Sequence, residues 1–229
     1  MSIEESTVLD NPNLNGAKTI AVMERALASN DKNALLNRRE FDKKGILAIN
    51  LMSSPGSGKT TLLEATAKRS GLRFAVVEGD METNRDADRL IKLGVKAYQI
   101  TTGTACHLEA DMVKKALENL ELSDLDVIFV ENVGNLVCPA SYELGTHLNV
   151  VLLSTPEGDD KVLKYPVMFR KADLVLITKS ELAELFDFSF DRVRDEARKL
   201  KPEIETIALS AKTGENFERW LAYVDSHLH

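Results

Sequence analysis

The residues with the clearest chemical potential form a glycine-rich segment, Ser53-Ser54-Pro55-Gly56-Ser57-Gly58-Lys59-Thr60-Thr61. A short apolar run precedes this segment and a helical pattern follows it, which is the context that a phosphate-binding loop needs. Backbone N–H groups of such a loop close around phosphate oxygens, and the helix start adds a partial positive charge. Lys59 is expected to reach the β- and γ-phosphates of a nucleotide, and Thr60 to place its hydroxyl on Mg²⁺. The predicted nucleotide contacts from this segment are Gly56, Ser57, Gly58, Lys59, Thr60 and Thr61.

Two acidic residues stand at the ends of other strand-like runs and fit the same site. Asp80 follows the run Phe74–Glu78, and Glu131 ends another apolar run. An acid at a strand end can hold the hydration shell of Mg²⁺ or orient the attacking water. We therefore expect Asp80 and Glu131 to act as catalytic groups with Lys59, and as the Mg²⁺ site with Thr60. A helix N-cap or a solvated loop is the ordinary alternative for either acid.

A near match to the guanine-recognition motif Asn-Lys-x-Asp follows the apolar run Leu174–Ile177. Here the motif reads Thr178-Lys179-Ser180-Glu181, in which Thr178 supplies no amide and Glu181 is one methylene longer than aspartate. Further along, Ser210-Ala211-Lys212 follows the last apolar run, where a backbone N–H can meet guanine O6 and would repel the amino group of adenine. Together the two motifs favour GTP or GDP over adenine nucleotides. The predicted base-site contacts are Thr178, Lys179, Glu181, Ser210, Ala211 and Lys212.

Two cysteines and a neighbouring histidine suggest a metal site. Cys106 and His107 come just before a predicted helix over Leu108–Leu120, and Cys138 follows the acidic strand end. A thiol at a helix N-terminus has a lowered pKa, and thiolate is the form that binds metal. Because adjacent residues of a helix point about 100° apart, joint ligation requires Cys106 to lie in the non-helical entry. Two thiolates and an imidazole suit Zn²⁺ or Ni²⁺ with a fourth ligand missing, and two buried structural cysteines are the alternative.

Short apolar runs alternate with amphipathic stretches and must position these residues. Several of the runs lack the polar alternation of a half-exposed strand, as strands buried on both faces do. Runs separated by helical patterns of roughly 10–20 residues imply right-handed βαβ units. We predict an α/β fold, a P-loop NTPase with a mainly parallel sheet of about seven strands flanked by helices. The predicted strands are Ile46–Met52, Phe74–Glu78, Ala97–Ile100, Val127–Glu131, Val150–Ser154, Leu174–Thr178 and Thr206–Ser210.

The length of the chain bounds its organisation. Its 229 residues are enough for one large α/β domain and too few for two ordinary ones. Residues 1–15 are predicted to form a loose tail, and residues 16 to about 43 a helix, or two helices broken near Ser29-Asn30-Asp31. We therefore divide the chain into a tail with a helical extension over residues 1–44 and a P-loop domain carrying the metal site over residues 45–229.

Composition excludes several classes of function. The net charge of −7 argues against a nucleic-acid partner, because proteins that depend on phosphate-backbone contacts usually show a basic face. No apolar run approaches the roughly 20 residues that span a bilayer, so no membrane role is expected. The first residues are acidic and polar, unlike a secretory signal. With two cysteines and no export signal, the expected compartment is the reducing cytoplasm, where free thiols are buried, reactive or metal-bound.

These motifs together resemble the HypB family, the nickel-insertion GTPases of hydrogenase maturation in the SIMIBI class of P-loop proteins. The resemblance covers about residues 45–225, nearly the whole domain. Its most specific carrier is Glu131-Asn132-Val133-Gly134-Asn135-Leu136-Val137-Cys138-Pro139-Ala140, since chance offers little reason for an acid, an asparagine, a glycine, a second asparagine and a cysteine in that order. The other carriers are the phosphate loop, Glu78-Gly79-Asp80 with Thr83, Asp86 and Arg89, and Thr102-Gly103 with Cys106-His107-Leu108.

The resemblance implies a protein that binds GTP or GDP with Mg²⁺, hydrolyses GTP slowly and forms a homodimer in response to nucleotide or metal. It implies Ni²⁺ or Zn²⁺ held by Cys106, His107 and Cys138 near the dimer interface, with the fourth ligand supplied by the partner subunit or by water. The implied partners are a nickel metallochaperone, the hydrogenase large-subunit precursor and urease maturation proteins. On this hypothesis the γ-phosphate orders the loops that bear Asp80 and Glu131, and hydrolysis releases nickel for hydrogenase maturation.

The sequence departs from the family pattern in two places and leaves three alternative functions open. Residues 1–105 contain no cysteine or histidine, so the N-terminal nickel site of many relatives is expected to be absent. Thr178 and Glu181 are expected to weaken guanine selectivity or to move one base contact onto another residue. The alternatives are a urease-type nickel GTPase, a nucleotide-gated metallochaperone without significant turnover, and a small-molecule kinase, against which Ser210-Ala211-Lys212 argues.

Overall fold

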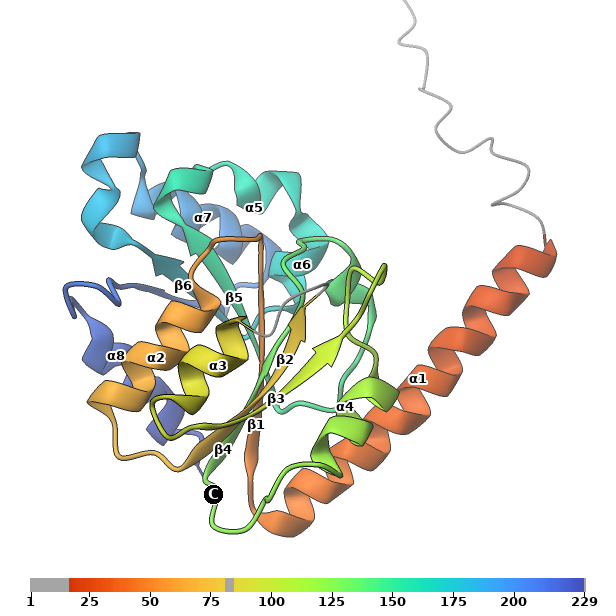
Figure 1. The fold of residues 1–229 in the computed structure, drawn as a ribbon. Coiled ribbons are helices and arrows are strands. Elements are labelled where there is room, and N and C mark those ends of the chain that lie inside the picture. Colours follow the sequence, from red (N-terminus) through yellow and green to blue (C-terminus); the bar gives the residue numbers. More distant parts are fainter. Residues whose placement is uncertain (1–16, 81–84, 229) are drawn as a thin grey trace, which may run out of the picture.

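A seven-stranded sheet forms the centre of the structure, a computed structural model that describes residues 17–80 and 85–228 (Figure 1). The strands are β1 (Leu47–Ser53), β2 (Phe74–Asp80), β3 (Lys96–Thr101), β4 (Val127–Glu131), β5 (Leu148–Ser154), β6 (Leu174–Thr178) and β7 (Glu205–Ala208). Their order is β3-β2-β4-β1-β5-β6-β7, and every pairing between neighbours is parallel. The predicted α/β fold is therefore confirmed. The predicted tail over residues 1–15 and Thr83 lie outside the described residues.

The central strand β1 shows why the strands of this sheet are continuous apolar runs without polar alternation. All seven of its residues are buried. Leu47, Ile49 and Leu51 enter the hydrophobic core on one face of the sheet, while Ala48 and Met52 enter the cores on the other face. A strand covered on both faces requires apolar residues at odd and even positions alike, so its sequence is a continuous apolar run.

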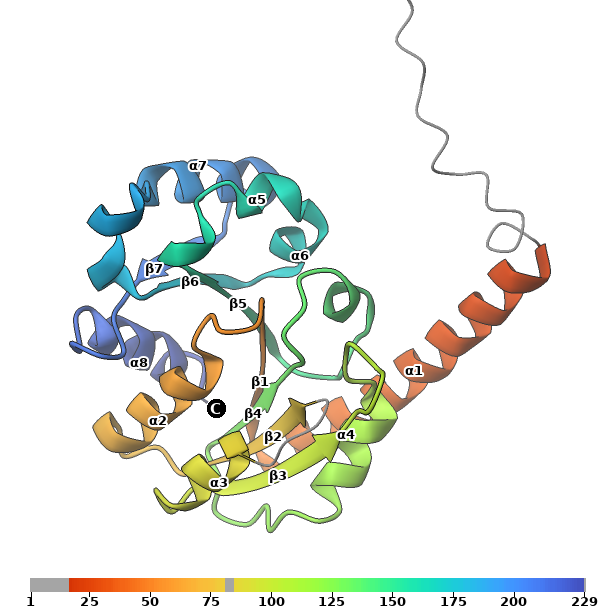
Figure 2. The same ribbon diagram turned by 45° about the horizontal axis from the view of Figure 1, so that its top comes forward.

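Helices cover both faces of the sheet and complete three layers (Figures 1 and 2). The helices of the described residues are α1 (Ala17–Lys44), α2 (Lys59–Arg69), α3 (Arg85–Ile91), α4 (Ala110–Leu117), α5 (Lys161–Lys164), α6 (Pro166–Lys171), α7 (Phe190–Leu200), α8 (Phe217–Asp225) and the 3₁₀ segments η1 (Cys138–Ser141), η2 (Thr155–Glu157), η3 (Ser180–Leu182) and η4 (Glu184–Phe186). On one face α2, α3 and α8 pack around Trp220. On the other, α1 and α4 pack around Phe41, and α5, α6 and α7 around Phe169.

The N-terminal extension forms one continuous helix, so the alternative of a break near residues 29–31 is wrong. Helix α1 lies beside α4, and its first turns extend beyond the domain (Figures 1 and 2). The helix ends where Gly45 adopts a φ of 63°. There the N–H of Ile46 donates to the carbonyl of Phe41 at 3.1 Å, a pairing that satisfies the last carbonyls of a helix. The division of the chain after residue 44 stays a prediction.

The direction of the strands decides where the functional loops lie. Because all neighbouring strands are parallel, β1, β2, β4 and β6 end at the same edge of the sheet. The phosphate segment, Asp80, the segment after Glu131 and Lys179 therefore lie at this edge. In the described part of the chain, no helix combines the length and the hydropathy that crossing a bilayer requires.

Candidate nucleotide site and metal centre

A cavity of about 390 Å³ opens at this edge of the sheet, above the phosphate loop. The loop bends around it with left-handed backbone at Gly56 and Gly58, whose φ values are 75° and 96°. Residues with a side chain rarely adopt this conformation, which explains both glycines. The cavity is lined by Pro55, Gly56, Gly58, Lys59, Thr60, Thr61, Glu78, Gly79, Asp80, Asp86, Arg89, Glu131, Asn132, Val133, Gly134 and Lys179.

Lys59 is held inside this cavity with its ammonium directed at the loop. The side chain is buried, and its Nζ donates to Ser53 Oγ at 3.0 Å. Burial lowers the pKa of Lys59, while the nearby carboxylates of Glu131 and Glu157 oppose that effect. Ser53 stands where the usual pattern has its first glycine. As the last residue of β1, it holds the ammonium of Lys59 at the start of the phosphate loop.

Thr60 and Glu131 are brought together as predicted. The hydroxyl of Thr60 donates to Glu131 Oε1 at 2.9 Å. Glu131 is only 5% exposed, and its other oxygen has no hydrogen-bond partner among the described residues. Burial raises the pKa of this carboxyl. Asp80 lines the same cavity. Carboxylate and hydroxyl oxygens with an unused lone pair fit a hard cation such as Mg²⁺.

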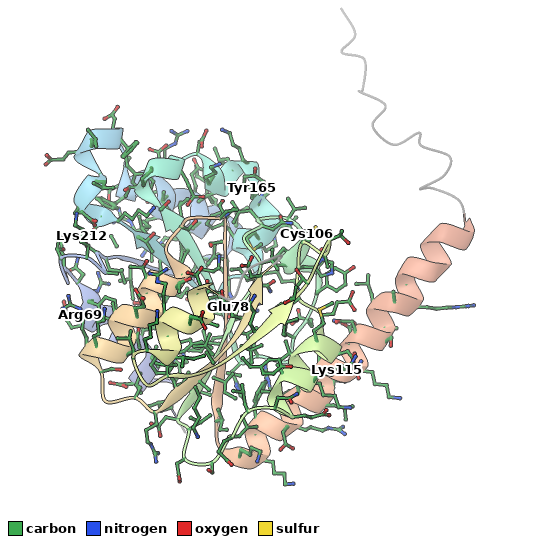
Figure 3. All side chains as sticks on the ribbon, in the orientation of Figure 1. Arg69, Glu78, Cys106, Lys115, Tyr165 and Lys212 are labelled. Atoms are coloured by element: carbon green, nitrogen blue, oxygen red, sulfur yellow. The ribbon has the colours of Figure 1, made fainter. Side chains whose placement is uncertain are left out.

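Glu78 is an acidic residue of the site that the sequence named as part of the resemblance but to which it gave no role. The register of β2 on β4 places it directly opposite Glu131, and it is only 2% exposed. Its side chain is labelled in Figure 3. Burial first, and then the charge of Glu131, raise the pKa of Glu78 to about 8. Its Oε2 has no hydrogen-bond partner among the described residues. The available signal was a glutamate within an apolar run, since a buried acid is costly unless it serves a site.

Glu157 is a second acid that the sequence did not single out. Its Oε2 accepts hydrogen bonds from Ser57 Oγ at 2.6 Å and from Ser154 N and Oγ at 2.9 and 2.7 Å. Burial would raise the pKa of Glu157, but the hydrogen bonds from the serines outweigh it and the pKa is lowered. The end of β5 is thereby attached to the phosphate loop through an ionised carboxylate.

The two predicted base-site loops lie side by side and are joined to the phosphate loop. The N–H of Ser180 donates to the carbonyl of Leu209 at 3.2 Å, which links the first loop to the start of the second. Thr178 Oγ1 donates to the carbonyl of Ser57 at 2.7 Å, and Lys179 Nζ donates to the carbonyl of Gly56 at 2.8 Å. The threonine that replaces the motif asparagine therefore anchors the phosphate loop.

The residues of the base-site loops differ in how far they are exposed to solvent. Glu181 and Lys212 are exposed, Ala211 is half-buried, and Ser210 is buried. The exposed side chains remain accessible to a base, whereas Ser210 uses its backbone N–H to bond the carbonyl of Glu215 at 3.0 Å.

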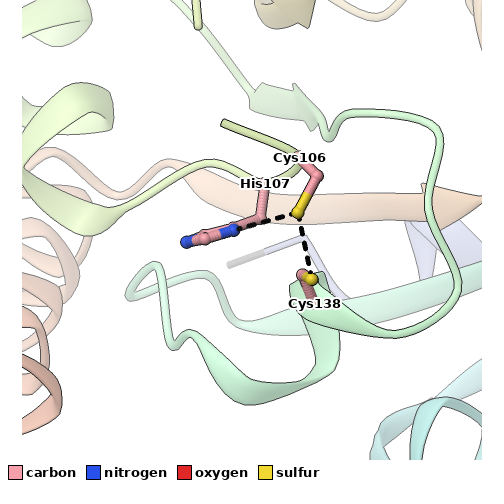
Figure 4. A group of neighbouring side chains, drawn as sticks. All are labelled: Cys106, His107 and Cys138. Carbon is pink, nitrogen blue, oxygen red and sulfur yellow. Dashed lines mark hydrogen bonds between the residues drawn. The ribbon is translucent and has the colours of Figure 1, made fainter. Parts of the chain in front are cut away.

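The three predicted metal ligands meet, although Cys138 lies 32 residues beyond Cys106. The two sulfurs are 3.0 Å apart, and His107 Nδ1 lies 3.8 Å from the sulfur of Cys106 (Figure 4). One donor atom from each residue falls within 4.8 Å of the other two. Both cysteines are free thiols and half-buried. Thiolate and imidazole donors at this separation suit Ni²⁺ or Zn²⁺.

One detail of the metal prediction is wrong. Helix α4 begins at Ala110 rather than Leu108, so Cys106 lies four residues before the helix and not two. The partial charge of that helix therefore does not act directly on the thiol, because the effect fades beyond the first turn. The non-helical entry still lets Cys106 and His107 point to one site, as joint ligation requires.

The surroundings of His107 and Cys138 affect both donors. The imidazole stacks on Tyr142 with ring centroids 3.8 Å apart and planes 25° apart. Burial lowers the pKa of His107, which favours the neutral form that binds metal. The hydrogen bond to Cys106 raises the pKa of Cys138, so this thiol must lose a proton when it binds a metal.

Comparison with known proteins shows the family of this chain. The family model for the CobW/HypB/UreG nucleotide-binding domain matches residues 47–208. The Helicobacter pylori hydrogenase/urease maturation factor HypB is 50% identical over 218 residues, covering 93% of this chain and 90% of its own. A crystal structure of H. pylori HypB in complex with nickel superposes with a TM-score of 0.84 at 49% identity, covering 88% of this chain and 97% of that one. A crystal structure of the hydrogenase maturation factor HypB from Archaeoglobus fulgidus superposes with a TM-score of 0.83 at 38% identity. It covers 89% of this chain and 100% of that one. The chain therefore belongs to the HypB family of hydrogenase and urease maturation factors.

Proposed function

We propose that this protein is a GTP-hydrolysing nickel-insertion factor. It binds Mg²⁺ and GTP in the cavity above the phosphate loop, carries Ni²⁺ on Cys106, His107 and Cys138, and delivers the nickel during maturation of NiFe hydrogenase and of urease. The names of its relatives, one of them crystallised with nickel, support the substrate. We place its action in the cytoplasm, with a nickel metallochaperone as donor and an enzyme precursor as acceptor.

The observation that carries this proposal is the short chain segment shared by the two sites. Glu131 lies against Thr60 in the nucleotide cavity, and Cys138 lies seven residues later in the metal centre. Between them, Asn135 Nδ2 donates to the carbonyl of Cys106 at 3.3 Å. A segment that meets the nucleotide at one end and nickel at the other gives each ligand a direct means of affecting the other.

The chemistry of hydrolysis follows from the residues around the cavity. Lys59 neutralises charge on the β- and γ-phosphates, and backbone N–H groups of the loop orient the phosphates. Thr60, Asp80 and Glu131 would hold Mg²⁺, which when bound neutralises charge on the phosphate oxygens. Instead of holding Mg²⁺, Asp80 could orient the attacking water. Arg89 lines the cavity, but its guanidinium is bound to Glu64 and Asp86. The described residues therefore offer no free arginine at the cavity, and slow turnover is expected.

Nucleotide state is proposed to control metal release through the loops that carry the acids. The γ-phosphate orders the segments that bear Asp80 and Glu131, and the ordered state favours a homodimer in which the partner subunit or water completes the nickel site. By linkage, if GTP alters nickel affinity, nickel must alter GTP affinity or dimerisation by the same free energy. Hydrolysis then returns the loops to the state that releases the metal.

The experiment that tests the proposal measures the Kd for Ni²⁺ with GDP and with a non-hydrolysable GTP analogue, together with the mass in solution. A nucleotide-dependent Kd that is lost in Cys138→Ala and kept in the exposed neighbour variant Ser141→Ala supports the switch. Nickel binding that ignores the nucleotide and survives loss of both cysteines contradicts it. Release of phosphate from GTP, absent in Lys59→Ala, separates a GTPase from a metallochaperone that only binds nucleotide.

A further inference from the structure

Helix α1 is attached by hydrogen bonds to both chain segments that bear the metal donors. We infer that its buried asparagines, Asn30 and Asn37, are positioning residues that hold these two segments at metal-binding separation. The inference rests on the proposed metal site and adds to it a structural element that contributes no ligand. The first segment runs from Cys106 to the start of α4, and the second runs from Cys138 to residue 146.

Asn37 forms the inner bridge. It is only 2% exposed, and its Nδ2 donates to two backbone carbonyls, that of Ala110 at 2.8 Å and that of Leu144 at 3.0 Å. Ala110 is three residues beyond His107 in the first segment. Leu144 is two residues beyond Tyr142, the ring that stacks on His107, in the second segment. One amide group therefore binds both segments at once.

Asn30 forms a second bridge two turns earlier in the helix. Its Oδ1 accepts from the N–H of Ala110 at 2.9 Å, and its Nδ2 donates to the carbonyl of Glu143 at 2.8 Å. The two asparagines thus use both backbone groups of Ala110, the first residue of α4. They also bind two consecutive carbonyls of the second segment, at Glu143 and Leu144.

Further contacts fix the second segment against α1. Arg38 donates to the carbonyls of Gly145 and Thr146. Gly145 has a φ of 87°, and a side chain there would meet the carbonyl oxygen of Ala34 in the helix. The segment therefore lies directly on the helix backbone at this point, so it cannot move without moving away from α1.

Two buried side-chain amides on one face of a helix indicate a specific role, because apolar side chains would pack there without needing hydrogen-bond partners. A buried amide that loses its partners carries the desolvation cost of the unpaired group, so the bonded arrangement is favoured only when both segments lie at one separation. That separation brings Cys106 and Cys138 together. Residues that hold metal ligands without touching the metal commonly change metal affinity about 10–100-fold when removed.

The test uses the full chain with Asn37→Leu, Asn30→Leu and, as a matched control on the same helix, Asn33→Leu. Asn33 is half-buried and makes neither bridge. Ni²⁺ affinity is measured by chelator competition, GDP affinity by fluorescence and Tm by calorimetry. The absorption spectrum of the Co²⁺-saturated protein reports how the thiolates meet the metal.

The expected result is Ni²⁺ binding weaker by about tenfold or more in Asn37→Leu and Asn30→Leu, with an altered Co²⁺ spectrum. GDP affinity stays within about twofold of wild type, and Asn33→Leu behaves as wild type. A role in stability alone would lower Tm but leave the Co²⁺ spectrum and Ni²⁺ affinity unchanged, which would overturn the inference. If Cys138→Ala also fails to alter Ni²⁺ binding in the unmodified background, the metal site itself is wrong and the inference falls with it.

Discussion

The side-chain oxygen of Asn132 accepts a hydrogen bond from the backbone N–H of Leu108 at 3.1 Å. Asn132 directly follows Glu131, the acid bound to Thr60, and Leu108 directly follows His107 of the metal centre. The bond is buried, so water cannot replace it, and its loss leaves an unpaired donor. Through this bond a change at the nucleotide acid can reach a metal donor.

Asn132→Ala is expected to uncouple the two sites. Without the amide oxygen, Leu108 is no longer held to the acid segment, so the difference in Ni²⁺ affinity between the GDP and GTP-analogue states should shrink by about fivefold or more. Calorimetric titration of Ni²⁺ in both nucleotide states measures this. Asn119→Ala, on the exposed surface near α4, serves as the control. An undiminished difference in Asn132→Ala would show that coupling travels by another route.

Glu78 should make the stability of the nucleotide-free protein depend on pH. Its pKa rises from 4.5 to about 8 on folding, so the native state binds more protons than the unfolded state within that window. Stability contributed by the neutral carboxyl is therefore complete below pH 4.5 and is lost as the pH rises toward 8. Glu78→Gln should remove this loss and raise Tm at pH 8 by roughly 3 °C or more relative to wild type.

The measurement for Glu78 is a series of Tm values between pH 5 and 8.5. The neighbouring acids Glu131, Asp86 and Asp80 are present in both proteins, so the comparison isolates Glu78. Glu184→Gln, at an exposed position, should follow wild type. Parallel curves for wild type and Glu78→Gln would mean that Glu78 is already ionised in the native state at neutral pH.

Glu157 is expected to order the phosphate loop through hydrogen bonds rather than through its charge. Glu157→Ala removes the acceptor of Ser57 and should weaken GDP binding by about tenfold. Glu157→Gln keeps an acceptor oxygen and removes a negative charge close to the phosphates, so it should bind GDP at least as tightly as wild type. Fluorescence titration with a labelled GDP compares the two. Equal losses in both variants would contradict loop positioning.

Gly134 allows the acid segment to pack against the phosphate loop. A Cβ built at this position would lie 2.8 Å from both N and Cα of Pro55, so Gly134→Ala must displace one of the two backbones. We expect GDP affinity to fall by about tenfold and stability by roughly 1–3 kcal/mol. Gly71→Ala is the matched control, because nothing lies within 4 Å of its added Cβ. Unchanged GDP binding in Gly134→Ala would mean that the loops are not in obligatory contact.

Much of the fold could be predicted because it follows from local patterns of apolar residues and glycines. The strands β4 and β6 were predicted at their observed bounds, since runs buried on both faces contain little but apolar residues. The phosphate loop was equally predictable, because left-handed backbone at Gly56 and Gly58 requires glycine. The bounds of the helices were harder to predict, and α4 starts two residues later than the amphipathic pattern indicated.

By itself the sequence determined the parallel α/β architecture, the phosphate loop and the residues able to bind metal, because each follows from residue type and spacing along the chain. Only the tertiary structure decided which distant groups meet. The register of β2 on β4 places Glu78 opposite Glu131, packing brings Cys106 to Cys138, and α1 folds back so that Asn37 binds two separate segments. Such pairings depend on strand register and on hydrogen bonds between segments far apart, and no local pattern of residues encodes either.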